Sequence, residues 1–280
     1  MKKHKTFIII FLQFTLGMKA QSIIPYFDSL ETPLTGYVLR FHDEFDSGKV
    51  DETVWQYRLG AYPRLASYGV KENVAVKDGN LVLTNTINPF FERCADSKQT
   101  CDKQVLVGGL ITKQDTFGYG YYESRLKVPV GAGFHTAFWA LSNTKRATPR
   151  RQEIDFIEQE SATPHVFTNN YHDHSQKERG EVAPKLGRAF VPKPPVDFSN
   201  DFQIIGCEYT PETLKFYLNG KLLRTLKTDL VPIREPMNIW LSVVAIKVDP
   251  ENSWQLSHWT IDKDKLPHCS YFDYVRYFSR

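Results

Sequence analysis

The chain has 280 residues, of which 41% are hydrophobic and 24% are charged, and its formal net charge is +3. These proportions exclude a disordered chain or a membrane bundle, and the small net charge gives no indication of a nucleic-acid partner. The length fits one large all-β domain or two small domains.

The N-terminal residues have the three-part pattern of a secretory signal peptide. Three lysines lie within residues 1–5, residues 7–16 are almost wholly apolar, and Ala20 precedes the expected cleavage point. The apolar run is too short to span a bilayer, and no nearby cysteine suggests a lipid anchor. We therefore expect a signal peptide at residues 1–20 and a mature protein, residues 21–280, that is secreted or periplasmic without a membrane anchor.

The rest of the chain is predicted to be nearly all strand. Short runs rich in β-branched and aromatic residues alternate with turn signals, and Asn219-Gly220 is typical of a two-residue hairpin. No long segment has helical periodicity, and no internal repeat or linker is evident. We expect one all-β domain, a β-sandwich or jelly roll of two antiparallel sheets. The clearest strands are predicted at residues 81–85, 118–128, 203–209 and 214–218.

Four cysteines fit an oxidising compartment. Cys94 and Cys101 enclose a polar, turn-like stretch, which predicts a disulfide between them, although two unpaired surface thiols would also fit. Cys207 and Cys269 fit either a bridge or buried thiols. No Cys-x-x-Cys spacing suggests a zinc site.

Residues 153–158, Glu-Ile-Asp-Phe-Ile-Glu, carry three acids separated by bulky apolar residues that favour a strand. In a regular strand Glu153 and Asp155 share a face and Glu158 points to the opposite one. One extra residue, a β-bulge, would return Glu158 to the acidic face. Like charges side by side are destabilising, so such a row indicates chemistry, although a solvated edge strand or a cation site are the alternatives. Retaining glycosidases need two carboxyl groups about 5–5.5 Å apart.

Further segments, in order along nearly all of the mature chain, strengthen this interpretation. With them the chain resembles glycoside hydrolase family 16, whose bulged signature is Glu-x-Asp-x-x-Glu. The resemblance implies a jelly roll with a substrate cleft on its concave face, and an endo-acting, retaining β-glycosidase that binds a polysaccharide as a monomer and requires no cofactor. The segments that carry it are residues 41–46, 72–76, 78–83, 119–125, 137–139, 208–211, 216–221 and 273–276.

The resemblance assigns roles to the three acids. Glu153 would be the nucleophile, Glu158 the acid/base, and Asp155 would hydrogen-bond the nucleophile and help to set its charge. This chemistry requires Glu158 to be protonated and Glu153 to be ionised at rest. Because three close carboxylates do not all ionise cheaply, we expect the cluster to retain one proton.

Other candidates are weaker. Trp139, Trp240 and Trp254 fit either sugar platforms or core packing, and His172 resembles the histidine that many family members place beside the acid/base. His172 and His174 with Asp173 would alternatively suggest a metal site, but the sequence offers no third strong ligand. The resemblance also implies an optional structural calcium ion, to which Glu44 and Asp273 are the candidate ligands.

The substrate is predicted less sharply. Laminarinases of the family read Gly-x-Trp-Pro-Ala-Phe-Trp, where this chain reads Gly-Phe-His-Thr-Ala-Phe-Trp at residues 133–139. Arg150 and Arg151 belong to basic segments around the acidic strand, which would either bind sulfate or uronate groups or form a solvated loop. We expect a neutral β-1,3- or mixed-linkage glucan, with a sulfated red-algal galactan of porphyran, agar or carrageenan type as the alternative. A non-catalytic carbohydrate-binding jelly roll would not need all three acids.

Overall fold

The computed structural model describes residues 35–62, 65–89, 104–142, 152–174, 187–193, 195–227, 235–246 and 261–280. Within these ranges the chain is all-β, and its only helical pieces are two 3₁₀ turns, Lys71–Asn73 and Lys263–Lys265. No helix in the described part is long and apolar enough to cross a bilayer. Several predictions lie outside the described residues: the signal peptide at 1–20, the Cys94–Cys101 disulfide, Trp254, Arg150 and Arg151.

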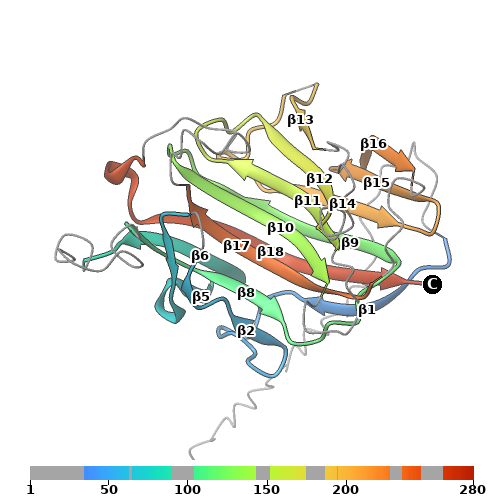
Figure 1. Cartoon of the computed structure of the whole chain (residues 1–280), viewed down its shortest axis with the longest axis horizontal. Coiled ribbons are helices and arrows are strands. Elements are labelled where there is room, and N and C mark those ends of the chain that lie inside the picture. Colours follow the sequence, from blue (N-terminus) through green and yellow to red (C-terminus); the bar gives the residue numbers. More distant parts are fainter. Residues whose placement is uncertain are drawn as a thin grey trace, which may run out of the picture.

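The strands form two sheets (Figure 1). The eleven-stranded sheet has the order β16-β15-β14-β9-β18-β6-β7-β4-β3, with β1 paired to β18 and β5 to β6. Its strands are β1 (Val38–Asp43), β3 (Gly60–Ala61), β4 (Ser67–Gly69), β5 (Val74–Lys77), β6 (Asn80–Ile87), β7 (Val105–Val107), β9 (Gly120–Lys127), β14 (Gln203–Tyr209), β15 (Thr213–Leu218), β16 (Lys221–Lys227) and β18 (His268–Ser279).

The seven-stranded sheet has the order β13-β12-β11-β10-β17-β8-β2. Its strands are β2 (Trp55–Tyr57), β8 (Gly109–Thr112), β10 (Phe134–Ser142), β11 (Gln152–Glu160), β12 (Phe167–Asp173), β13 (Arg188–Phe190) and β17 (Met237–Ala245). The long strands β12, β11, β10 and β17 lie side by side at its centre (Figure 1). The predicted fold of two packed sheets is confirmed. It differs in one pair, because β4 and β7 are parallel.

The core lies between the sheets and follows from the alternation of side chains along each strand. Phe156 of β11 stacks on Tyr122 of β9 with ring centroids 4.7 Å apart, which joins the two sheets. Phe156 also packs against Phe138 of β10 at 4.6 Å. Each of these rings is at most 1% exposed, and fully burying such a side chain stabilises the fold by about 1.5–3 kcal/mol. Packing of the core-facing side chains of β11 therefore fixes the position of the strand, and with it the position of the acidic side chains on its opposite face.

The predicted hairpin at Asn219-Gly220 is confirmed. Both residues have positive φ, 49° and 80°, and Leu218 pairs directly with Lys221 across the two-residue turn. Two positive φ angles are the requirement of a type I′ turn, which asparagine and glycine tolerate best. The predicted strands also agree closely with β6, β9, β14 and β15, and 203–209 has the same bounds as β14.

Candidate active site

The acidic strand β11 contains the predicted bulge. On the β10 side, Asp155 pairs with Trp139 and Ile157 pairs with Phe138, so Phe156 has no partner. On the β12 side, the register also shifts between Asp155 and Glu158. Phe156 and Ile157 both lie in the core, at 1% and 0% exposure, and Glu158 returns to the face of Asp155.

The three acids differ in how far they are buried. The Asp155 side chain is 5% exposed, Glu153 is 19% exposed and Glu158 is 28% exposed. Ile154, between the first two, is wholly buried in the core. The carboxyl groups of Glu153 and Glu158 are therefore accessible to a ligand, whereas the carboxyl group of Asp155 between them is nearly inaccessible.

Asp155 is the acid best suited to retain a proton. Burial, followed by the negative charges of Glu158 and Glu153, raises the pKa of Asp155 well above its usual range. Its Oδ2 atom lies 3.3 Å from Nε2 of His172 on β12. Within the row, Asp155 is therefore the acid on which the one expected proton is most favoured.

The surroundings of Glu158 act against the protonated resting state expected for it. Burial acts to raise its pKa, but the hydrogen bond and charge of His135 on β10, helped by His172 and Thr168 on β12, outweigh burial and lower the pKa. Nε2 of His135 lies 3.4 Å from Oε1 of Glu158, and the Thr168 hydroxyl donates to Oε2 at 3.3 Å. This direction does not favour the protonated form expected of Glu158 at rest, and that resting state stays a prediction.

Glu153 has two histidines beside it, both from the end of β12. Oε2 of Glu153 lies 3.1 Å from Nε2 of His174, and Oε1 lies 4.0 Å from Nε2 of His172. The two imidazole rings stack with their centroids 5.5 Å apart. Asp155 was expected to bond the nucleophile directly, whereas the described contacts link the two carboxylates through His172.

Aromatic residues lie beside the acids on the same face. Trp139 of β10 and Trp240 of β17 pair across the strands, and their rings are 4.6 Å apart. The guanidinium of Arg58 lies over both rings, at 5.6 and 5.3 Å, and over Tyr62 at 4.0 Å. Burial raises the pKa of Tyr62 to about 12, against the opposing charge of Arg58. Trp139, Trp240 and Arg58 adjoin the acids. Burial lowers the pKa of Arg58, and the charges of Tyr62 and Glu153 oppose this effect.

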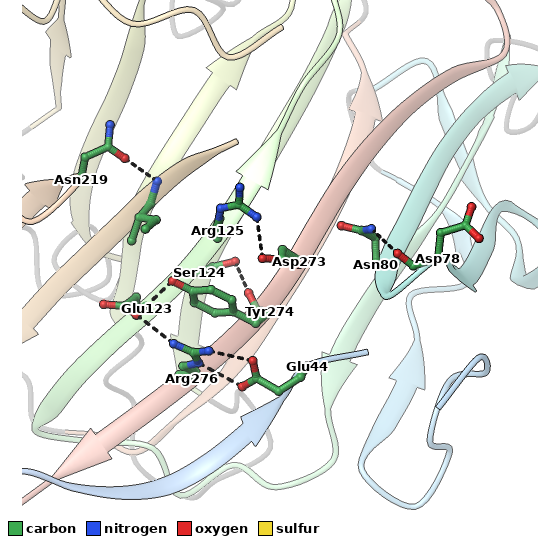
Figure 2. A network of polar contacts seen from close by, with 11 residues as sticks. Glu44, Asp78, Asn80, Glu123, Ser124, Arg125, Asn219, Asp273, Tyr274 and Arg276 are labelled. Carbon is green, nitrogen blue, oxygen red and sulfur yellow. Dashed lines mark hydrogen bonds and ion pairs between the residues drawn. The ribbon is translucent and has the colours of Figure 1, made fainter. Parts of the chain in front are cut away.

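Glu44 and Asp273, the candidate calcium ligands, each have an arginine partner instead (Figure 2). Arg276 holds both oxygens of Glu44, at 3.0 and 2.8 Å, and Arg125 lies 2.7 Å from Asp273. These guanidinium groups already supply positive charge to the two carboxylates, which does not favour a joint calcium site there, and Glu44 and Asp273 as calcium ligands stay a prediction. A calcium ion elsewhere stays a prediction.

One group in the described part has metal-ligand types close together: Glu153, Asp155 and His172 offer ligand atoms within 4.8 Å of one another. These residues are the acidic row itself with its histidine. Asp155 is nearly buried and its raised pKa disfavours the charged form, so it is a poor ligand for a cation. The group therefore fits acid chemistry better than metal binding.

Arg58, His135 and His174 are the functional candidates that sequence reasoning missed or placed in another role. Arg58 comes from the start of the chain, and only the pairing of β2 with β8 and of β8 with β17 brings its neighbourhood to the acids. His135 had one signal, since it stands where laminarinases carry tryptophan. His174 was considered only as a metal ligand.

Comparison with known proteins agrees with this geometry. A family model described as "Beta-porphyranase A-D, GH16 domain" matches residues 37–279. The chain is 27% identical over 274 residues to beta-porphyranase B of Phocaeicola plebeius, covering 84% of this chain and 82% of that protein. It is 27% identical over 198 residues to a glucan endo-1,3-beta-glucosidase of Cryptopygus antarcticus, covering 68% and 69%.

A solved structure shows the same fold. The catalytic domain of a laminarinase from Thermotoga petrophila matches with a TM-score of 0.71 at 24% identity, over 87% of this chain and 98% of that one. The relatives therefore include both a porphyranase and a glucan endo-1,3-beta-glucosidase. The chain belongs to glycoside hydrolase family 16 and is a glycosidase that hydrolyses O-glycosyl bonds.

Proposed function

We propose that this glycosidase cleaves a β-linked polysaccharide internally and with retention, by double displacement at Glu153 and Glu158. The observation that carries the proposal is the bulge at Phe156, which sets two partly open carboxyl groups on one face, on either side of the buried Asp155, whose raised pKa favours its protonated form. Two carboxyl groups acting in sequence, one as nucleophile and one as acid/base, are the requirement of retaining hydrolysis.

In the first step Glu153 attacks the anomeric carbon, the glycosidic bond breaks, and Glu158 gives its proton to the departing oxygen. Glu158 therefore takes up a proton before this step, and the approach of a sugar favours that by removing water from the carboxyl group. In the second step Glu158, now a carboxylate, takes a proton from water, whose oxygen displaces Glu153 from the sugar. The configuration at the anomeric carbon is kept.

A neutral β-1,3- or mixed-linkage glucan is the first candidate substrate. Trp139 and Trp240 offer apolar surface beside the acids, which suits the faces of uncharged sugar rings. Curated relatives with this activity support the candidate, namely the C. antarcticus glucan endo-1,3-beta-glucosidase and an endo-1,3-1,4-beta-glycanase of Rhizobium meliloti that is 28% identical over 202 residues.

A sulfated galactan is the second candidate, and a specific observation favours it. Arg58 lies beside the aromatic pair with no carboxylate in ion-pair contact among the described residues, and guanidinium matches the oxygens of a sulfate ester. The porphyranase-type family model and the P. plebeius relative support this candidate. Binding of sulfate by the basic segments with Arg150 and Arg151, which lie outside the described residues, stays a prediction that belongs to this candidate.

Reducing-end release from a panel of laminarin, lichenan, agarose, porphyran and κ-carrageenan tests the function and separates the candidates. We expect one class to be cleaved, with oligosaccharides of several sizes among the first products, as internal cleavage requires. Glu153→Gln is the matched inactive control. No release from any member, or equal release by the control, would overturn the proposal.

We also propose that the protein is exported, on the pattern of residues 1–20 alone. N-terminal sequencing of protein recovered outside the cytoplasm is expected to begin at Gln21. Recovery of only the uncleaved chain inside the cell would contradict this.

A further inference from the structure

We propose that His135 is a positioning residue for Glu158, holding this carboxyl group in the orientation and ionised form that the second, base-catalysed step needs. The inference rests on the proposed roles of the acids and deepens them. It gives a role to His135, the residue that stands where laminarinases carry tryptophan.

The strand pairing places His135 next to Glu158 at one end of the acidic row. Residues 135, 137 and 139 share the outer face of β10, and Ala137 pairs with Glu158 while Trp139 pairs with Asp155. His135 lies one step further along, and its small neighbour Ala137 leaves the imidazole free to reach Oε1 of Glu158 at 3.4 Å. The His135 side chain is only 15% exposed, so its contact is partly shielded from water.

Glu158 is held from both sides. The Thr168 hydroxyl of β12 binds Oε2 at 3.3 Å and His135 of β10 binds Oε1, so each oxygen has a partner on a different neighbouring strand. A carboxyl group clamped in this way has little freedom to rotate, which favours accurate placement for proton transfer.

The other charged groups around Glu158 act in opposite directions. His172 of β12 favours the ionised form of Glu158, whereas the charges of Glu158 and Glu153 favour the protonated form of Asp155 on the same strand. Glu160, also on β11, is the Cα partner of His135. Toward β17, the outer-face neighbours Ser242 and Val244 carry no charge. His135 thus contacts the carboxyl group at the acid/base end of the row, as His174 does at the nucleophile end.

The proton balance of the second step shows what His135 contributes. Water gives one proton to Glu158 while the water oxygen bonds to the anomeric carbon and the bond from that carbon to Glu153 breaks. His135 takes no part in this transfer, and its Nε2 atom, 3.4 Å from Oε1, holds the Glu158 carboxylate in place until the proton arrives. Losing His135 leaves this carboxylate beside Asp155 with only Thr168 bonded to it, and its pKa rises.

The test is a carbon-13 NMR titration of mature protein labelled at glutamate carboxyl carbons, without substrate. The resonance that disappears in Glu158→Gln identifies Glu158. We compare His135→Gln, which keeps a neutral donor, and His135→Leu, which removes the donor. The matched control is His42→Gln, because His42 forms a similar 3.3 Å pair with Glu44 on the other sheet.

We expect the midpoint of Glu158 to shift to higher pH in His135→Gln, to shift further in His135→Leu, and to stay in place in His42→Gln. An unchanged or lower midpoint in the His135 variants would overturn the proposal. If His135→Leu does not fold, His135→Gln decides alone. Because the titration needs no substrate, its result is independent of whether any polysaccharide is cleaved.

Kinetics on laminarin and porphyran give a second readout. We expect His135→Gln to lower kcat more than it changes KM, and to displace the pH–rate profile toward higher pH, following the carboxyl group. A raised KM with kcat and pH profile unchanged would instead show that His135 only binds sugar, and would overturn the proposal.

Discussion

Asp155 lies opposite Trp139 across the β10–β11 ladder, whereas the next residue of β11, Phe156, has no partner on β10. This single unpaired residue determines the site. It sends two consecutive side chains, Phe156 and Ile157, into the core and brings Glu158 back to the face of Asp155. A bulge at this point re-aims a side chain without breaking the sheet.

The bulge is anchored by the packing of Phe156, so Phe156→Ala is expected to destabilise the fold by about 3–5 kcal/mol. The reason is the cavity left between Tyr122 and Phe138, which contact the ring from both sheets. Chemical unfolding measures the change. The control Val191→Ala, at a residue that is 63% exposed, is expected to stay within about 0.5 kcal/mol of the wild type. Equal stability of Phe156→Ala and wild type would refute the anchoring role.

Asp155→Asn is expected to change how stability depends on pH. The folded pKa of Asp155 is raised above its unfolded value, so its protonated form contributes fully below the unfolded pKa of about 3.9. That contribution is lost as pH rises through the folded pKa. The neutral amide cannot lose a proton, and the free energy of unfolding of Asp155→Asn relative to wild type is therefore expected to increase with pH. Unfolding curves at several pH values above 4 measure it, and a difference that is constant or decreases would contradict the assignment.

Arg58→Gln separates the two substrate candidates. If a sulfate ester binds this guanidinium, losing a charged hydrogen bond of about 1.5–3 kcal/mol lowers kcat/KM on porphyran by roughly 10- to 150-fold. Added salt is also expected to weaken turnover of a charged substrate by wild type, because it screens exposed charges. Arg40→Gln, at an exposed arginine on β1 of the other sheet, is the control. On a neutral glucan the salt effect is expected to be absent. An unchanged kcat/KM of Arg58→Gln on porphyran would show that Arg58 does not bind a sulfate ester.

The thiol chemistry is testable apart from catalysis. Cys207 and Cys269 are free in the structure, while the predicted Cys94–Cys101 bridge lies outside the described residues. Alkylation of unreduced, denatured protein is expected to label Cys207 and Cys269 only. A Cys94–Cys101 disulfide, which closes a short loop, is then expected to stabilise the fold by about 2–3 kcal/mol. Peptide mapping that finds Cys94 and Cys101 alkylated would exclude the bridge.

The sequence predicted those features that depend on neighbours along the chain. Alternation and turn residues located β6, β14 and the Asn219-Gly220 hairpin, and the spacing of the acids predicted the bulge. It could not predict contacts between distant strands. Arg58 lies near the acids only because β2 pairs with β8 and β8 pairs with β17. His135 on the neighbouring strand lowers the pKa of Glu158. Two arginines form ion pairs with the expected calcium ligands. Each of these depends on register, which the local pattern does not specify.

The central claim is that Glu153 and Glu158 hydrolyse the bond with retention. Glu158→Gln keeps the shape of the side chain but removes its proton transfer, and a general acid or base contributes about 10²–10⁴-fold to the rate. Glu153→Gln removes the nucleophile and is expected to abolish turnover, with both variants unfolding at the wild-type temperature. If the amide variants unfold at a lower temperature than the wild type, their inactivity would follow from lost structure and not from the lost carboxyl group. That result would contradict the expectation.

Proton NMR of the first products released by wild type from the polysaccharide that the panel identifies tests the claim most directly. Retention predicts that the β-anomer of the new reducing end appears first and converts to the α-anomer only by mutarotation. Initial release of the α-anomer would contradict the double displacement and, with it, the assignment of Glu153 as nucleophile.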